Sequence, residues 1–275
     1  MSKSHANTVL VLTIILISVS TGGCSAIQTP EAPPVLQGTP DDLTSKLEGL
    51  SLDDFFEVSW RELSLRDPEG IVGDGLVEFF ELEGVGLTDI SDEYIRETGQ
   101  MHAEILELLR AYNRSELTPE QQISYDVYEW YLDDLVRSQE FMYYDYPATF
   151  YPITSVHERI IYFFTDLHPV ANQQDAEDYV TRLGQMGIKF EQLLEGLKLR
   201  EEAGIIPPRF ATQWALYGVR NIGRSSAIHT PFYASFEEKV NYLEDISDAQ
   251  QQALLDAAEE VIDEVVLPAY QDLAL

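Results

Sequence analysis

The sequence has few of the groups on which most catalytic and nucleic-acid-binding sites depend. Of its 275 residues, one is cysteine, five are histidine and 17 are lysine or arginine, against 48 aspartates and glutamates, so the formal net charge is −31. A surface this negative repels phosphate backbones and anionic headgroups. Nucleic acid is therefore excluded as an expected partner, and a single cysteine excludes an intrachain disulfide.

The shortage of positive charge has two explanations, which the sequence leaves open. A strongly negative surface would keep the protein soluble in a salty environment. An acidic exported protein from an ordinary habitat is the other explanation, and it is supported by a hydrophobic fraction that is not reduced, at 45%. Hydrophobic residues at this level predict a folded chain. The residues from Asp41 to Leu275 are enough for one large helical domain or two tightly packed small ones.

The one cysteine stands at the end of an N-terminal export segment. Lys3 precedes an apolar run, 9–19, which has the length of a signal-peptide hydrophobic region and is short for a membrane span. Small residues then lead to Cys24, as in a bacterial lipobox, although Thr21 stands where leucine is usual. We expect residues 1–23 to be a lipoprotein signal peptide and Cys24 to be lipidated; a general signal peptide with a chance cysteine is the alternative.

A proline-rich stretch separates Cys24 from the folded part. Residues 24–40 contain four prolines, few charges and no hydrophobic periodicity. This composition predicts a tether that lifts the domain 41–275 off the membrane. We expect an exported protein that meets the membrane through its lipid anchor and faces the periplasm or the cell exterior.

Helix signals dominate from residue 41 onward. Thr118-Pro119-Glu120-Gln121 places a capping threonine, an N1 proline and an N3 glutamine in register, and Ser247 with Gln250 repeats the capping pair. No stretch shows convincing period-two alternation over several strands. The sequence therefore predicts an all-α fold, an antiparallel helical bundle-like domain with long helices and short loops. The expected helices are 51–67, 94–112, 118–135, 157–168, 175–203, 210–219 and 247–275, with a glycine-rich loop over 70–86.

Aromatic residues are concentrated in one proline-interrupted segment. Tyr143 to Tyr151 contains Pro147 and precedes Pro152, so we expect it to be extended and mostly buried against the helix that begins near Thr118. Its rings could line a cleft for a peptide or another extended ligand, or form a corner of the core. The candidate cleft-lining residues are Tyr143, Tyr144, Tyr146, Phe150 and Tyr151.

The sequence predicts no metal ligand and no catalytic residue. A helical zinc hydrolase carries His-Glu-x-x-His, with two imidazoles one turn apart; His157-Glu158 begins such a motif, but Ile161 stands where the second histidine is needed. We interpret the pair as a helix start, where glutamate suits the positive end of the dipole. Other acidic groupings are interpreted as solvated helix faces. They are His102 with Glu104 and Glu107, and the pairs Glu259/Asp263 and Glu260/Glu264.

Nucleophilic and phosphate-binding motifs are also missing from the sequence. There is no Gly-x-Ser-x-Gly, and the glycine-rich loop 70–86 contains no basic residue. The thiol of Cys24 is consumed by the expected lipidation.

Several short motifs resemble, in their order and spacing, a known bacterial family. Over nearly all of Asp41 to Leu275 they are similar to the N-terminal portion of the domain of unknown function 885 family. The motifs are Phe55-Phe56, Trp60-Arg61-Glu62-Leu63, Asp67-Pro68, Leu117-Thr118-Pro119-Glu120-Gln121, Ser124-Tyr125-Asp126, Tyr146-Pro147, Asp178-Tyr179, Arg182-Leu183, Gly204-Ile205-Ile206-Pro207-Pro208-Arg209 and Leu267-Pro268-Ala269-Tyr270.

This resemblance implies a relation to helical zinc metallopeptidases. Family members are much longer, and their His-Glu-x-x-x-His-type zinc motif lies in a C-terminal half that this sequence does not contain. The resemblance therefore implies zinc as a cofactor only of that half, and it assigns no ligand or general base to the residues present.

Two functions follow as hypotheses. The first is the non-catalytic half of a peptidase-like lipoprotein, a truncated or split family member whose partner is a downstream C-terminal half. This hypothesis is favoured because Leu273 and Leu275 are apolar and no helix-termination signal follows Pro268. The second is a stand-alone surface lipoprotein that binds a peptide-like ligand or scaffolds a complex. A downstream reading frame with the zinc motif would favour the first, and a stable, monomeric, ligand-binding product the second.

Overall fold

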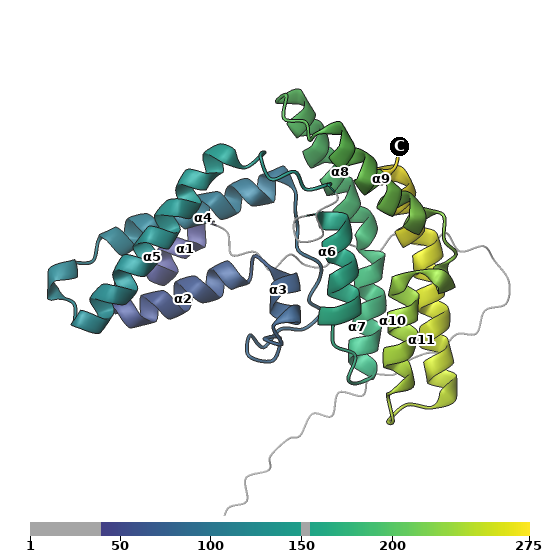
Figure 1. Ribbon diagram of the computed structural model, residues 1–275. Helices are drawn as coiled ribbons and strands as arrows, with labels where there is room; N and C mark the ends of the chain where they lie inside the picture. Colours follow the sequence, from purple (N-terminus) through teal and green to yellow (C-terminus); the bar gives the residue numbers. More distant parts are fainter. Residues whose placement is uncertain (1–39, 150–154) are drawn as a thin grey trace, which may run out of the picture. The chain divides into compact units, whose positions relative to one another are not determined.

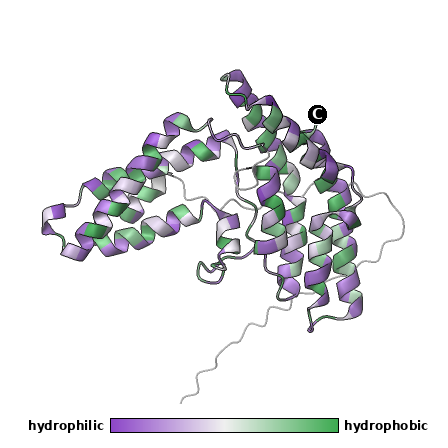
Figure 2. Ribbon diagram, in the orientation of Figure 1, coloured by the Kyte–Doolittle hydropathy of each residue, from purple (hydrophilic) through white to green (hydrophobic). Residues whose placement is uncertain are grey.

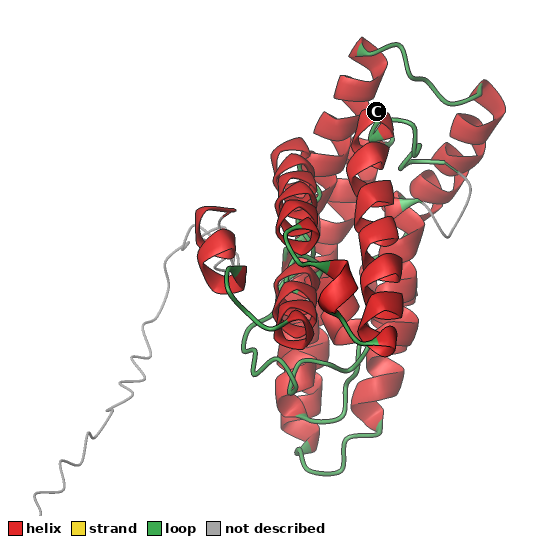
Figure 3. Ribbon diagram, turned by 90° about the vertical axis from the view of Figure 1, so that its left-hand side faces the viewer, coloured by secondary structure: helices red, strands yellow, loops and turns green. Residues whose placement is uncertain are grey.

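The computed structural model describes residues 40–149 and 155–275, and these fold as helices joined by turns and loops (Figures 1 and 3). No strand occurs among them, which confirms the predicted all-α fold. None of the helices in these two ranges is long and apolar enough to cross a membrane. Cys24 and the candidate residues Phe150 and Tyr151 lie outside the described residues.

Four helices of the first half of the chain share one hydrophobic core. Figure 1 shows α4 and α5 side by side, with α1 and α2 packed along them. The core side chains come from all four helices, with Phe55, Ile105 and Leu109 completely buried. These helices are α1 (Pro40–Leu47), α2 (Leu52–Ser64), α4 (Asp92–Arg110) and α5 (Pro119–Ser138).

The second half forms a larger core, which is rich in aromatic rings. Tyr179, Phe232 and Tyr270 are completely buried within it. Figure 2 shows hydrophilic and hydrophobic residues intermixed along the helices, as expected when one face of a helix meets a core and the other meets water. The helices are α6 (Val156–Tyr162), α7 (Gln173–Gly184), α8 (Met186–Glu202), α9 (Arg209–Gly223), α10 (Pro231–Asn241), α11 (Asp248–Val261) and α12 (Leu267–Leu273), with π-helical turns at Phe163–Leu167 and Ile262–Val266.

The predicted helix starts are confirmed in atomic detail. At α5 the Thr118 hydroxyl accepts a hydrogen bond from the backbone N–H of Gln121, whose side-chain oxygen accepts from the N–H of Thr118. Ser247 and Gln250 form the same reciprocal pair at α11. Each pair satisfies two backbone donors that the helix leaves free, so the signal needs only four consecutive residues.

The predicted helix 51–67 does end before Pro68, at Ser64, but other expectations were wrong. The first residues of the predicted loop 70–86 belong to the short helix α3 (Pro68–Gly73), where the fixed φ of Pro68 suits a helix start. The helix α10 was not predicted. The expected helix 175–203 is broken at Gln185 into α7 and α8. The Gln185 side-chain oxygen accepts a hydrogen bond from the backbone N–H of Leu87 at 2.8 Å, so a contact remote in sequence stabilises the break.

The connection between α3 and α4 is held against α7 and α8 by side chains of those two helices. Lys189 is buried, and its Nζ lies 2.6 Å from Oε1 of Glu69 and donates to the carbonyl of Thr88. Arg182 donates to the carbonyl of Val85 at 2.7 Å. These bonds satisfy loop carbonyls that no helix or strand satisfies.

Candidate functional site

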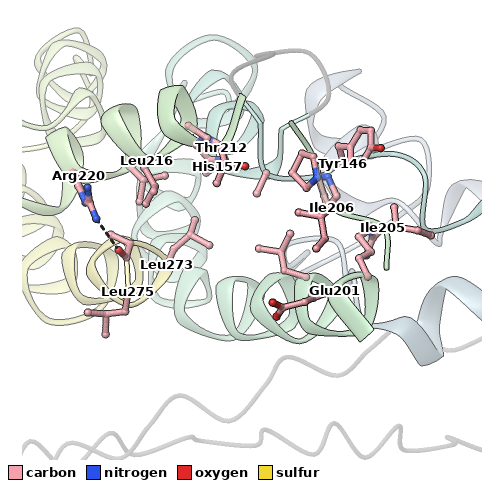
Figure 4. A pocket seen from close by; sticks show the side chains of 18 residues that line it. Tyr146, His157, Glu201, Ile205, Ile206, Thr212, Leu216, Arg220, Leu273 and Leu275 are labelled. Carbon is pink, nitrogen blue, oxygen red and sulfur yellow. Dashed lines mark hydrogen bonds between the residues drawn. The ribbon is translucent and has the colours of Figure 1, made fainter. Parts of the chain in front are cut away.

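A cavity of about 320 Å³ opens among α6, α8, α9 and α12 (Figure 4). The segment 146–148 closes one side of it, and its walls are mainly aliphatic. This volume lies at the lower end of the range for small-molecule pockets. The aliphatic wall residues include Leu197, Ile205, Ile206, Leu216, Val219 and Leu273.

His157 is the unusual polar group of this cavity. Its side chain is 1% exposed, and neither ring nitrogen has a hydrogen-bond partner in the described part of the chain. Its Nε2 lies 3.9 Å from Oε1 of Glu158, which is too far for a hydrogen bond. Burial lowers the pKa of His157 to about 4, so the ring is neutral at pH 7 and offers one donor and one acceptor. Buried polar groups without partners are rare and destabilising, so a ligand that hydrogen-bonds here would offset that cost.

The position of His157 is set by its own helix and by α12. As the sequence predicts, the pair His157-Glu158 lies in the first turn of α6, with Glu158 at the positive end of the dipole. The backbone carbonyl of His157 accepts a hydrogen bond from the hydroxyl of Tyr270 at 2.8 Å. The place of His157 in a cavity wall was not predicted, because the other walls come from helices remote in sequence.

Tyr146 lines the end of the cavity away from Arg220, and its backbone is strained. Its φ is 47°, and Glu81 is the other non-glycine residue with a positive φ in the described ranges. Such a conformation is sparsely populated for a bulky side chain, and strained residues cluster at functional sites. In the described ranges, Tyr146 is the predicted cleft residue that does line a cavity.

The other described aromatic candidates lie elsewhere. Tyr143 donates a hydrogen bond to Asp92 at 2.7 Å and accepts one from Arg96, so it is bound to α4. Tyr144 is 60% exposed. The expectation of a buried, extended segment against α5 is wrong for residues 143–145, which form turns. Proline excluded a continuous helix here, but it did not decide between a turn and an extended chain.

Three charged side chains border the cavity, and one of them is already paired. Arg200 donates to Asp145 through Nε at 3.0 Å and through Nη2 at 2.5 Å. Arg220 is exposed and donates one long hydrogen bond, 3.5 Å, to the carbonyl of Ala274. Glu201 is also exposed. Figure 4 shows Arg220 at one end and Tyr146 with Ile205 at the other, while Glu201 lies across from the side that carries His157 and farther from Arg220 than His157 does.

A second hollow, of about 570 Å³, lies beside α3 and α6. Its least exposed carboxylate, Glu69, is paired with Lys189 and accepts a hydrogen bond from the backbone of Thr88 at 3.0 Å. Asp67 accepts from the Thr88 hydroxyl at 2.6 Å. These two carboxylates are therefore already engaged by protein groups.

The described residues offer no site for zinc, which the resemblance implies only for the C-terminal half of the family. Within 40–149 and 155–275, no group of three or more His, Cys, Asp or Glu side chains has an arrangement that could hold a metal ion. Both ring nitrogens of His168 are engaged, Nδ1 with the carbonyl of Pro169 and Nε2 with the guanidinium of Arg182. His229 shares a hydrogen bond with Ser226.

The residues predicted to form solvated helix faces differ in their exposure to solvent. His102 is half-buried and burial lowers its pKa, so the expectation of a solvated residue is wrong for it. Its neighbour Glu104 accepts a hydrogen bond from Thr44 of α1. The four carboxylates at i,i+4 spacing are exposed, as expected of a solvated helix face. They are Glu259, Glu260, Asp263 and Glu264.

Comparison with known proteins identifies the family. The family described as "Bacterial protein of unknown function (DUF885)" matches residues 83–275, which include every residue lining the cavity. The chain belongs to this family. The resemblance found in the sequence is thereby confirmed over residues 83–275, whereas the relation to zinc metallopeptidases stays a prediction.

A solved structure shares the fold of this DUF885 chain. It is described as "the putative lipoprotein from Colwellia psychrerythraea", with a TM-score of 0.69 and 16% sequence identity, and the match covers 82% of this chain and 41% of that one. At this identity the similarity shows the fold alone. The chain thus spans about two-fifths of the length of that structure. No curated protein matches the sequence.

Proposed function

We propose that this DUF885 protein is an envelope lipoprotein whose helical domain is the non-catalytic, ligand-binding half of a peptidase-like protein. The observation that carries the proposal is the aliphatic cavity with unpartnered His157 in its wall. The designation of the neighbouring structure supports the lipoprotein part, and its greater length supports a further half.

A stand-alone ligand-binding lipoprotein is the second candidate function. It is favoured because α6, α8, α9 and α12 of this one chain wall the cavity, so no second chain is needed to form it. The two candidates differ in whether catalysis appears when the rest of a family protein is supplied.

The first prediction concerns the anchor. Replacing Cys24 with alanine is expected to abolish incorporation of a fatty-acid probe, because the thiol is the proposed attachment point and no other cysteine exists. Metabolic labelling followed by fluorescence detection of the purified chain measures it. The neighbouring change Ser25→Ala serves as the matched control and should label like the wild type. Equal labelling of the Cys24→Ala variant would contradict the anchor.

The second prediction concerns zinc and hydrolysis. The purified chain is expected to bind no stoichiometric zinc and to hydrolyse no peptide by itself, since a catalytic zinc needs three protein ligands and an open position for water. Metal analysis and a peptidase assay with and without added zinc provide the test. Chelator-sensitive hydrolysis that is lost in His157→Ala would contradict this prediction. Activity that appears only with an added C-terminal half of a family member would favour the first candidate function over the second.

A further inference from the structure

The polar groups of the cavity follow a linear order that suggests what it binds. Arg220 lies at one end, His157 follows along one wall, and Glu201 lies on the facing wall farther from Arg220 (Figure 4). The surfaces between these groups are aliphatic, with Ile206 and Leu216 among them. A matching ligand therefore has an anionic end, a cationic end, an apolar body and a hydrogen-bonding group in the middle.

The length of the cavity limits the size of such a ligand. Its wall on α9 extends from Thr212 to Arg220, which at 1.5 Å per residue is about 12 Å of helix. An extended peptide advances about 3.3–3.6 Å per residue, so about four residues cover that length. The volume of about 320 Å³ also requires a small ligand.

The chemistry of the three polar groups fits a peptide backbone. The Arg220 guanidinium has five N–H donors and one long bond in the structure, so it can receive a carboxylate. Glu201 can receive an ammonium group. His157 can accept from an amide N–H or donate to an amide carbonyl, and either bond would satisfy a nitrogen that is unpartnered in the described chain.

We propose that this cavity binds a short apolar peptide of about four residues with free ends, its amino group at Glu201, its carboxylate at Arg220 and a backbone amide hydrogen-bonded to His157. This inference rests on the proposed ligand-binding function and specifies its ligand. A fatty acid would pair with Arg220 but would leave Glu201 without a partner and would offer the ring of His157 no amide.

Calorimetric titration of the purified protein with the tetrapeptide leucyl-alanyl-alanyl-leucine tests the proposal. The free peptide is expected to bind, and amidation of its carboxyl end or acetylation of its amino end is expected to weaken binding about threefold to fivefold each, as for an exposed ion pair. Amidation should have no further effect in Arg220→Gln, and acetylation none in Glu201→Gln. The matched controls Arg224→Gln and Glu202→Gln change exposed residues outside the cavity and should behave like the wild type.

A third variant tests the middle of the cavity. His157→Phe keeps a ring of similar size but removes both nitrogens, and it is expected to weaken peptide binding about tenfold, as for one buried hydrogen bond. Thermal unfolding followed by circular dichroism shows whether this variant folds. If it does not, the comparison of free and blocked peptides on the wild-type protein still decides the proposal.

Three results would overturn the inference, and they have different consequences for the proposed function. Equal binding of free and doubly blocked peptides would show that the charged ends are not recognised. If dodecanoate binds, the peptide does not, and dodecanoate binding is lost in His157→Phe, the peptide proposal is wrong but the cavity still binds a ligand. Binding of neither would overturn the inference together with the ligand-binding part of the proposed function, while the anchor would still be judged by the labelling of Cys24.

Discussion

Replacing Tyr270 with alanine is expected to lower the free energy of unfolding by about 3–5 kcal/mol, the range for a large buried side chain. Tyr270 is completely buried on α12, and its ring centre lies 4.8 Å from that of Phe190 and 6.2 Å from that of Phe232. Truncation would leave a cavity among rings from α8 and α10, which the rigid helices cannot fill by collapse. Urea unfolding measures the change as a lower midpoint with an unchanged slope.

Two control variants separate packing from hydrogen bonding at this position. Tyr270→Phe keeps the ring but removes the hydroxyl that donates to the carbonyl of His157, so a loss of about 1 kcal/mol is expected. Tyr242→Ala, at a tyrosine that is 78% exposed, should change stability by less than about 0.5 kcal/mol. A Tyr270→Ala variant as stable as Tyr242→Ala would refute the assignment of Tyr270 to the core.

Acidification from pH 7 to pH 5 is expected to destabilise the protein, with about 2 kcal/mol lost through each of two buried histidines. Burial lowers the pKa of His157 to about 4 and, with the nearby guanidinium of Arg182, that of His168 to about 3, against an ordinary 6.5. Below pH 6.5 the unfolded chain binds protons that the folded chain does not. The contribution of each histidine to stability is therefore complete above pH 6.5 and is lost as the pH falls from 6.5 towards the folded pKa.

The hydrogen bonds of His168 make its neutral state structurally necessary. Its Nε2 accepts from the Arg182 guanidinium, while Nδ1 lies 2.7 Å from the carbonyl of Pro169 and can donate to it. A proton on Nε2 would point at the arginine cation. The ring therefore cannot be protonated without breaking this arrangement, which agrees with the lowered pKa.

Urea unfolding at several pH values measures this dependence. His157→Phe removes one of the two titrating rings, so its stability is expected to fall about 2 kcal/mol less than that of the wild type between pH 7 and pH 5. His229→Gln, which changes an exposed histidine, is the matched control and should keep the wild-type dependence. If stability rises on acidification, or if His157→Phe has the wild-type dependence, the buried neutral state of His157 is wrong.

The sequence was sufficient for features that depend on neighbouring residues. A capping box involves four consecutive positions, so the helix starts at Thr118 and Ser247 can be predicted without knowledge of the rest of the fold. Hydrophobic periodicity over a few turns likewise predicted the helical class. The family could be recognised because the order of its motifs is itself a property of the sequence.

The tertiary structure alone decided the features that join distant residues. The break at Gln185 is stabilised by a bond to Leu87, 98 positions away, and the position of His157 depends on Tyr270, 113 positions away. Whether an imidazole is partnered depends on which helices surround it, so the pattern His157-Glu158 indicated a helix start and revealed nothing of the cavity. The sequence by itself determined the helical class, the capped helix starts and the family, since these depend on local order. Packing determined the helix break at Gln185 and the site, because burial and hydrogen bonding arise between segments that meet only in the folded chain.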